Sequence, residues 1–274
     1  MTETGAGGTR PRLDFPAVSR PWISIVIPAY NEERGITSAL SSVSSWLADR
    51  SGSYEIIVVD NASEDRTVEC VQALADGERI RVLRNASNYG KGYSVRRGML
   101  DASAPLRLHC DADCVPCFSS LPLMLRLAEQ NDVVVGSRLA AGARISRRQP
   151  LRRRIVGRTF VDLCRLLLHE PTRDLFCGFK LWREEAALAT YSRTQLDGWT
   201  FDAEALAVAR ALGYRLRETG IAWDERQGSR LSMPRVLVPV LRELLQARRD
   251  VRRLRSYDQC ARDVLMPEPA EPRP

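Results

Sequence analysis

The sequence predicts an α/β fold in which a mainly parallel sheet is covered by helices. In the first half of the chain, short apolar runs alternate with segments of helical periodicity, as expected for parallel strands joined by helices. The runs are apolar throughout, which is typical of strands buried on both faces. The chain has 274 residues, 44% of them hydrophobic and 27% charged, the composition of a globular protein with a substantial core.

The elements of the first half follow in order along the chain. The apolar runs predict strands at residues 23–27, 54–59, 80–83, 106–110 and 133–135. Helices are predicted at residues 31–49, 64–76, 93–102 and 119–130. No run approaches 18 consecutive apolar residues, which excludes a membrane-spanning helix.

The second half is more mixed. Residues 152–168 predict an amphipathic helix, with arginines opposite an apolar stripe of Val156, Phe160, Leu163 and Leu167. An irregular loop containing Gly178 is expected at residues 173–182. Further on, we expect a helix at 201–212, a strand at 215–223 and a basic helix at 234–255.

Polar residues collect directly after four of the predicted strands. Because open parallel sheets bind ligands beyond the carboxyl ends of their strands, these residues are expected to line one site. They are Pro28 to Glu32 after the first strand, Asp60 to Ser63 after the second, Asp111 to Asp113 after the fourth, and Gly136 to Arg138 after the fifth.

Asp111 and Asp113 have the pattern of a divalent-metal site. Two carboxylates separated by one residue can bind one Mg²⁺ or Mn²⁺ and leave coordination positions for diphosphate oxygens. Asp60, at a neighbouring strand end, is suited to hydrogen bonding with uracil or ribose. The glycine-containing loop at residues 85–92 carries Lys91, one of only two lysines, and could contact a nucleotide, although it lacks the spacing of a Walker loop.

The charge distribution indicates an anionic partner. Forty-one Lys and Arg against 34 Asp and Glu give a net charge of +7, and residues 138–158 contain eight arginines and no acid. A segment of one sign attracts nucleic acid, anionic lipid or a phosphorylated substrate, and a solvated helix face is the alternative interpretation.

The seven cysteines indicate a reducing cytoplasm, because their odd number and spacing do not suit a disulfide-stapled domain. Cys110, Cys114 and Cys117 have a spacing that resembles the iron–sulfur motif of radical S-adenosylmethionine enzymes. Acidic residues interrupt that motif and a buried strand precedes it, so we interpret these cysteines as small core residues.

Several ordered motifs resemble those of family 2 glycosyltransferases, which have the GT-A fold. They are PAYNE at residues 28–32, VVDNAS at 58–63, NYGKG at 88–92, DAD at 111–113 and GSR at 136–138. Three later motifs resemble dolichyl-phosphate glucosyltransferases, with dolichol-phosphate mannose synthases as close relatives. These are RDLFCGFK at 173–180, GWTFDAE at 198–204 and GSRL at 228–231. The resemblance covers residues 22 to 255, approximately.

The resemblance implies a metal-dependent, inverting transfer of a sugar, glucose from UDP-glucose, to a polyprenyl or dolichyl phosphate. Asp111 and Asp113 would hold the metal and diphosphate, and Arg138 and Arg153 the acceptor phosphate. The residues expected to bind the nucleotide sugar are Pro28, Tyr30, Glu32, Asp60, Asn61, Lys91, Asp111, Trp199 and Asp202. The domain would span residues 21–255, with a nucleotide half at about 21–137 and an acceptor half at about 138–255. A flexible leader at residues 1–20 and a disordered, proline-rich tail at 256–274 are expected on either side.

Three departures from the family pattern affect this expectation. Asn61 stands where a second acid is usual, which could weaken or redirect a base or ribose contact. Val115 stands where mannose synthases often have glutamine, which favours the glucosyltransferases or a single acid as direct ligand. Many prokaryotic relatives carry membrane helices after the catalytic domain, and this chain has none, so a cytoplasmic enzyme, free or peripheral on the membrane, is expected.

The chemistry of the acceptor separates the remaining alternatives. A phosphate monoester is already anionic near neutral pH and needs positioning by arginine, whereas a sugar hydroxyl needs an Asp or Glu base. Asp202 and Glu204 are candidate bases, or acids that only stabilise a helix N-terminus. One alternative is a soluble glycosyltransferase with a small acceptor and UDP-N-acetylglucosamine or another donor. Another is a basic module that docks on anionic membranes or nucleic acid; it would leave the strand-end acids unused, so no nucleic-acid partner is expected.

Overall fold

The computed structural model describes residues 20–48, 50, 52–75, 77, 79–146, 151–224 and 240–255, with backbone only at 151–156. The predicted tail, residues 147–150, the motif at 228–231 and all of the predicted leader except Arg20 lie outside the described residues. So does the start of the predicted basic helix, which is helical over residues 240–255. No helix in these described ranges is long and apolar enough to cross a membrane.

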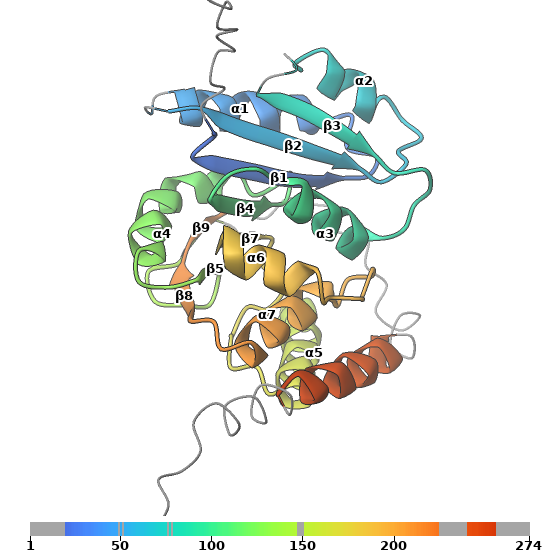
Figure 1. Cartoon of the computed structure of the whole chain (residues 1–274), viewed down its shortest axis with the longest axis vertical. Coiled ribbons are helices and arrows are strands. Elements are labelled where there is room, and N and C mark those ends of the chain that lie inside the picture. Colours follow the sequence, from blue (N-terminus) through green and yellow to red (C-terminus); the bar gives the residue numbers. More distant parts are fainter. Residues whose placement is uncertain are drawn as a thin grey trace, which may run out of the picture.

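A seven-stranded sheet forms the centre of the molecule, in the order β3-β2-β1-β4-β7-β5-β8 (Figure 1). All neighbouring strands are parallel except β7, which is antiparallel to both β4 and β5. The strands are β1 (Ile23–Ala29), β2 (Tyr54–Asp60), β3 (Ile80–Arg84), β4 (Leu106–Cys110), β5 (Val133–Ser137), β7 (Phe179–Arg183) and β8 (Leu216–Gly220). The predicted α/β class and mainly parallel sheet are confirmed.

Apolar cores cover both faces of the sheet, as the uninterrupted apolar runs predicted. In β1, Ile25 and Ile27 belong to one core and Val26 to the other, because successive side chains of a strand point to opposite faces. The first core includes residues of α1 (Ile36–Ala48), α2 (Thr67–Gln72), the 3₁₀ helix η1 (Val115–Ser120) and α4 (Leu121–Ala128). The second includes residues of α3 (Lys91–Asp101), α5 (Leu151–Leu168), α6 (Glu184–Tyr191), α7 (Phe201–Ala211) and the helix at 240–255.

The prediction of an irregular loop at residues 173–182 is only partly correct, because the last residues of this segment form strand β7. This strand pairs with β4 on one side and β5 on the other. Both of its faces are buried, and Lys180 lies within it fully buried. A lysine inside a short apolar run weakens the strand pattern in the sequence, and the strand is stabilised by pairing partners that are distant in the chain. Helix α6, which follows it directly, was not predicted.

Among the boundaries that differ from the prediction, two have a structural cause. The first helix begins at Ile36 and not at Asn31, because the backbone amides of Asn31 and Glu32 bond to the side chains of Ser63 and Thr67 in the segment after β2. The strand predicted at residues 215–223 divides into β8 and β9 (Ala222–Trp223), and β9 pairs with β6 (Arg144–Ile145) in a separate small sheet.

The apolar stripe predicted on residues 152–168 packs partly against the protein. Phe160 and Leu167 contact the second core, and Phe160 stacks on Phe176 with ring centroids 5.5 Å apart. Leu166, outside that stripe, is 73% exposed. The outward surface of α5 is therefore not the stripe that the periodicity indicated.

Candidate functional site

The polar strand ends meet at one edge of the sheet, as predicted. β1, β2 and β4 are adjacent and parallel, and the register aligns Ala29 with Asp60. The amide of Asn61 donates to the carbonyl of Ala29 at 2.8 Å, which ties the ends of β1 and β2 together. The segments after these strands therefore face a common site.

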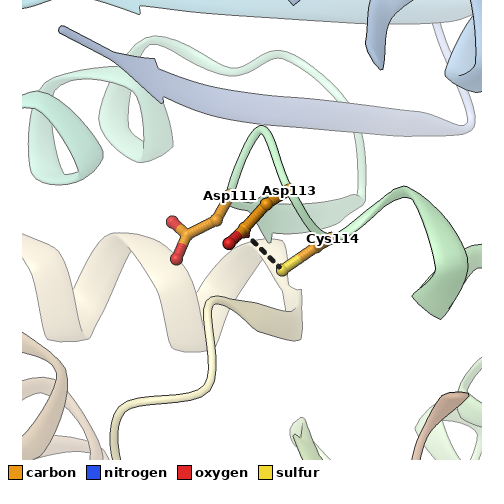
Figure 2. A group of neighbouring side chains, drawn as sticks. All are labelled: Asp111, Asp113 and Cys114. Atoms are coloured by element: carbon orange, nitrogen blue, oxygen red, sulfur yellow. Dashed lines mark hydrogen bonds between the residues drawn. The ribbon is translucent and has the colours of Figure 1, made fainter. Parts of the chain in front are cut away.

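Asp111 and Asp113 lie in the tight turn that follows β4. Figure 2 shows their carboxyl groups on the same side of this turn, with the Cys114 thiol beside Asp113. Ligand atoms of the three residues lie within 4.8 Å of one another, and Cys114 Sγ is 3.8 Å from Asp113 Oδ1. Two hard carboxylate ligands at this spacing fit one Mg²⁺ or Mn²⁺. The Cys114 thiol also donates to the Gly178 carbonyl at 3.3 Å, so it fastens the turn to the segment before β7.

Gly178 makes room for Asp111. The Asp111 amide donates to the Gly178 carbonyl at 2.8 Å. A Cβ atom at position 178 would lie 2.0 Å from Asp111 Oδ2, closer than any real contact. The position of Asp111, the first acid of the candidate metal site, thus requires glycine at position 178.

Two basic side chains hold the Asp111 carboxylate. Lys91 Nζ is 2.6 Å from Oδ2, and His109 Nε2 is 3.2 Å from Oδ1. Burial alone would raise the pKa of Asp111, but Lys91 and His109 outweigh it and hold that pKa well below its usual range. Burial likewise opposes the charge of Lys91, and the carboxylates of Asp111 and Asp202 raise its pKa well above normal. The pair is therefore fully charged at neutral pH.

A buried ion pair lies behind this acid. Lys180 and Asp202 are both almost fully buried, and Lys180 Nζ donates to Asp202 Oδ1 and to the Cys177 carbonyl. His109 Nδ1 is 3.8 Å from Asp202 Oδ1, so the imidazole lies between the two aspartates. Asp202, expected to contact the nucleotide sugar, is instead paired with Lys180 in this structure, and a part in donor binding remains a prediction.

Five of the nine residues expected to bind the nucleotide sugar, Pro28, Tyr30, Glu32, Asp60 and Asn61, lie around the ends of β1 and β2. Asp60 is fully buried and accepts from the Ser63 amide at 3.3 Å, with Arg84 Nε 3.6 Å away. Tyr30 is 42% exposed, and Pro28 and Glu32 are partly exposed. A cavity of about 380 Å³ adjoins this end of the sheet, lined by Ala62, Ser63, Arg84, Asn85 and Ala86.

Asn61 is buried among side chains of the loop before α3. Its Nδ2 donates to Asn88 Oδ1 at 2.6 Å, and its Oδ1 accepts from Asn85 Nδ2 at 2.9 Å and from the Tyr89 amide at 3.1 Å. Trp199, by contrast, is 53% exposed, and Lys91 Nζ lies 5.6 Å from its ring centre. The structure thus brings Trp199 to Lys91 and Asp111.

Arg138 at the end of β5 is held by Asp174. Its Nε and Nη2 donate to the two carboxylate oxygens at 2.8 and 2.7 Å, and its backbone amide donates to the same group. Burial would raise the pKa of Asp174, but these hydrogen bonds lower it. The guanidinium also lies over the Trp223 ring at 5.2 Å and is held in one orientation. Arg153 lies in α5, and its side chain is outside the described residues.

Glu204 has a structural partner. Its carboxylate accepts hydrogen bonds from the amides of Gln195 and Leu196 at 2.9 to 3.1 Å. Burial raises its pKa despite these bonds. It therefore fixes the segment that leads to Trp199.

Sequence reasoning assigned no role to His109, Lys180 or Gly178. The sequence did contain an indication for His109. Residues two apart in a strand share a face, and His109 stands two residues before Asp111. The sequence also contained an indication for Lys180, because a lysine inside an apolar run is unusual. The requirement for Gly178 had none, since it depends on the approach of β7 to β4.

The interpretation of the cysteines as core residues is confirmed for the described ones in the motif. Cys110, Cys114 and Cys117 are each at most 1% exposed and are free thiols.

Comparisons with known proteins identify the family. The sequence model described as glycosyl transferase family 2 matches residues 24–189. A dolichyl-phosphate beta-glucosyltransferase of Trichomonas vaginalis is 32% identical over 238 residues, covering 81% of this chain and 70% of the relative. The enzyme of the same name from Drosophila melanogaster is 32% identical over 225 residues, covering 77% and 69%.

A solved structure shares the fold. The glucosyl-3-phosphoglycerate synthase of Mycobacterium tuberculosis, in complex with Mn²⁺ and UDP-glucose, has a TM-score of 0.59 at 20% identity and covers 87% of this chain and 84% of its own. The order of motifs, the strand-end acids and the extent of these matches agree, and the chain belongs to glycosyl transferase family 2.

Proposed function

We propose that this chain transfers glucose from UDP-glucose to a polyprenyl phosphate at a membrane surface. The observation that carries the proposal is that both candidate bases are already engaged. Asp202 forms an ion pair with buried Lys180, and Glu204 accepts hydrogen bonds from two backbone amides. A hydroxyl acceptor needs a base, whereas a phosphate monoester arrives as an anion and needs only to be held. The relatives named dolichyl-phosphate beta-glucosyltransferases support the same acceptor class.

Asp111 and Asp113 would hold the divalent cation, Mg²⁺ or Mn²⁺, and the Mn²⁺ named with the structural neighbour supports this assignment. When bound, the cation supplies charge neutralisation to the departing diphosphate. Lys91 adds a positive charge fixed at the same place, since it stays ionised beside Asp111. Asp60 and the exposed ring of Tyr30 would bind the nucleoside, and Trp199 would cover the sugar.

Arg138 would hold the acceptor phosphate. Asp174 binds the edge of the guanidinium formed by Nε and Nη2, and Nη1 lies on the other side of the group. The side chain is 28% exposed, so a ligand can reach it. Because Asp174 and Trp223 fix the arginine beforehand, binding a phosphate costs it little side-chain entropy.

The membrane surface is the source of the acceptor in this proposal. The acid-free segment at residues 138–158 supplies arginines that attract anionic head groups, and Leu139 and Leu166 are 49% and 73% exposed. Since the stripe with Phe160 packs inward, contact with lipid would use these exposed leucines and the arginines.

The test gives the purified chain radiolabelled UDP-glucose and Mn²⁺ with either a polyprenyl phosphate in vesicles or 3-phosphoglycerate. We expect label in an organic-soluble product with the lipid acceptor. Faster labelling of the soluble acceptor would contradict the proposal and favour the soluble glycosyltransferase. Binding to anionic vesicles should fall as salt rises.

A pair of variants tests the acceptor residue. R138A should raise the acceptor KM about tenfold and leave the UDP-glucose KM unchanged, because a charged hydrogen bond is worth about 1.5–3 kcal/mol. R144A removes the same charge from exposed β6 and serves as the control. Equal effects of both variants would mean that the segment contributes only general attraction.

A further inference from the structure

The loop before α3 is fastened to the body of the protein at two places. At its start, Asn61 makes three hydrogen bonds to Asn85, Asn88 and Tyr89. At its end, the Gly92 amide donates to the Asp197 carbonyl at 2.7 Å, and a Cβ at Gly90 would lie 2.2 Å from the same oxygen. Lys91 stands between these two glycines, within the second attachment, and its Nζ reaches Asp111 from there.

The Asn61 side chain has its hydrogen-bonding capacity committed to this loop. Its oxygen accepts two hydrogen bonds, which occupies both lone pairs, and the residue is only 5% exposed. Asn88 Oδ1 accepts hydrogen bonds from Asn61 Nδ2 and, at 3.2 Å, from the Gly90 amide. Asn85 extends the network, donating to Ser94 Oγ at 3.0 Å and accepting from Arg97 at 2.7 Å on the first turns of α3.

An amide suits this position, because the loop presents both donors and an acceptor to it. A carboxylate has no donor, so Asp at 61 would place its oxygen against Asn88 Oδ1, where the donor–acceptor distance is now 2.6 Å. Alanine would leave buried donors on the loop without a partner. Either change would remove the hydrogen bonds that hold the start of the loop, while the hydrogen bond from Gly92 to Asp197 would remain.

We infer that Asn61 is a positioning residue, which holds the loop at residues 85–90 so that Lys91 stands at Asp111 and the diphosphate end of the donor site. Asn61 acts through Lys91 and does not itself bind the nucleotide sugar. The inference relies on the proposed function for the identity of the donor. A misplacement of about 1 Å at a reacting group can cost about 100-fold in rate.

The experiment compares N61D and N61A with N131D, a control amide-to-acid change at the end of α4, where Asn131 donates to the Leu127 carbonyl. UDP affinity with Mn²⁺, kinetic constants and backbone hydrogen exchange are measured for each. We expect N61D to lower kcat/KM for UDP-glucose by about 10- to 100-fold. The acceptor KM should not change, and exchange should rise only in the loop and the first turn of α3. N131D should behave as the wild type.

A double-mutant cycle with K91M decides whether Asn61 acts through Lys91. In the K91M background, we expect N61D to lower UDP affinity and kcat/KM by no more than about threefold further. The reason is that residue 91 then carries no charge for the loop to position. A full multiplicative loss in that background would show that Asn61 touches the donor and would overturn the inference. So would wild-type constants in N61D, or a rise of exchange across the whole sheet. If the wild type binds UDP but glucosylates no polyprenyl phosphate, the proposed function fails, while the UDP-binding cycle and the exchange data still test Asn61.

Discussion

The part of the candidate site expected to bind the nucleotide and the part expected to bind the acceptor, called here the nucleotide half and the acceptor half, position their polar groups by different means. The nucleotide half uses neutral amides: Asn61, Asn85 and Asn88 fix the loop that carries Lys91. The acceptor half uses buried charge, in the pairs Lys180–Asp202 and Arg138–Asp174. Two unpaired carboxylates would repel an incoming phosphate, and pairing each with a cation removes that repulsion. The amides add no charge of their own, so the charge at the end of this loop is that of Lys91 and of Asp111, with which it is paired.

The largest effect should come from removing Asp113, which we propose as a ligand of the divalent cation. D113A should lower turnover about 10³-fold, because stabilisation of the leaving diphosphate is worth several kcal/mol. The fold should be kept, since the side chain lies in the turn after β4 and not in a core. Circular dichroism and Mn²⁺ affinity accompany the kinetics. Full activity of D113A and D111A in the presence of chelator would mean that the mechanism is not metal-assisted.

Breaking the buried pair of the acceptor half should cost stability. K180M leaves Asp202 as an uncompensated buried charge and should lower the free energy of unfolding by about 3–5 kcal/mol. The double variant K180M/D202L replaces the pair by apolar groups and should recover much of the loss. Urea unfolding measures both. If K180M unfolds like the wild type, the pair does not stabilise this half.

A third comparison uses two glycines. G178A puts a methyl group against Asp111 and should lower donor kcat/KM about 10- to 100-fold, because the acid must move. G157A lies in α5, and no described neighbour outside the helix's own backbone comes within 4 Å of the new Cβ, so it should raise stability by about 0.5–1 kcal/mol. The two variants are compared by UDP-glucose kinetics and thermal unfolding. Equal activities would show that Asp111 has room that the structure does not suggest.

The smallest expected effect is a pH dependence of stability that arises from the Arg138–Asp174 pair. Arg138 lowers the folded-state pKa of Asp174 below its unfolded value of about 3.9. The resulting stabilisation is complete above that value and is lost as the pH falls through the lower folded-state pKa. D174N should therefore be less stable than the wild type at pH 7, and the difference should shrink toward pH 3. A difference that stays constant with pH would show that the ionised carboxylate is not what stabilises this contact.

The sequence by itself determined six of the seven strands of the described sheet, the edge that carries the candidate site and the acids on that edge. Continuous apolar runs specify strands buried on both faces, and a group of polar residues directly after such a run marks the end of the strand. Asp60, Asp111 and Asp113 were therefore predictable from local pattern, and so was the parallel arrangement that brings them to one edge.

The tertiary structure alone decided which of these groups are paired. Arg138 meets Asp174 across 36 residues, and Lys91 meets Asp111 across 20. The insertion of β7 between β4 and β5 places Lys180 against Asp202 and requires glycine at position 178. The physical reason is that local periodicity records only whether a side chain faces the core or solvent. The partner of a buried charge depends on the order of the strands, which no short segment contains.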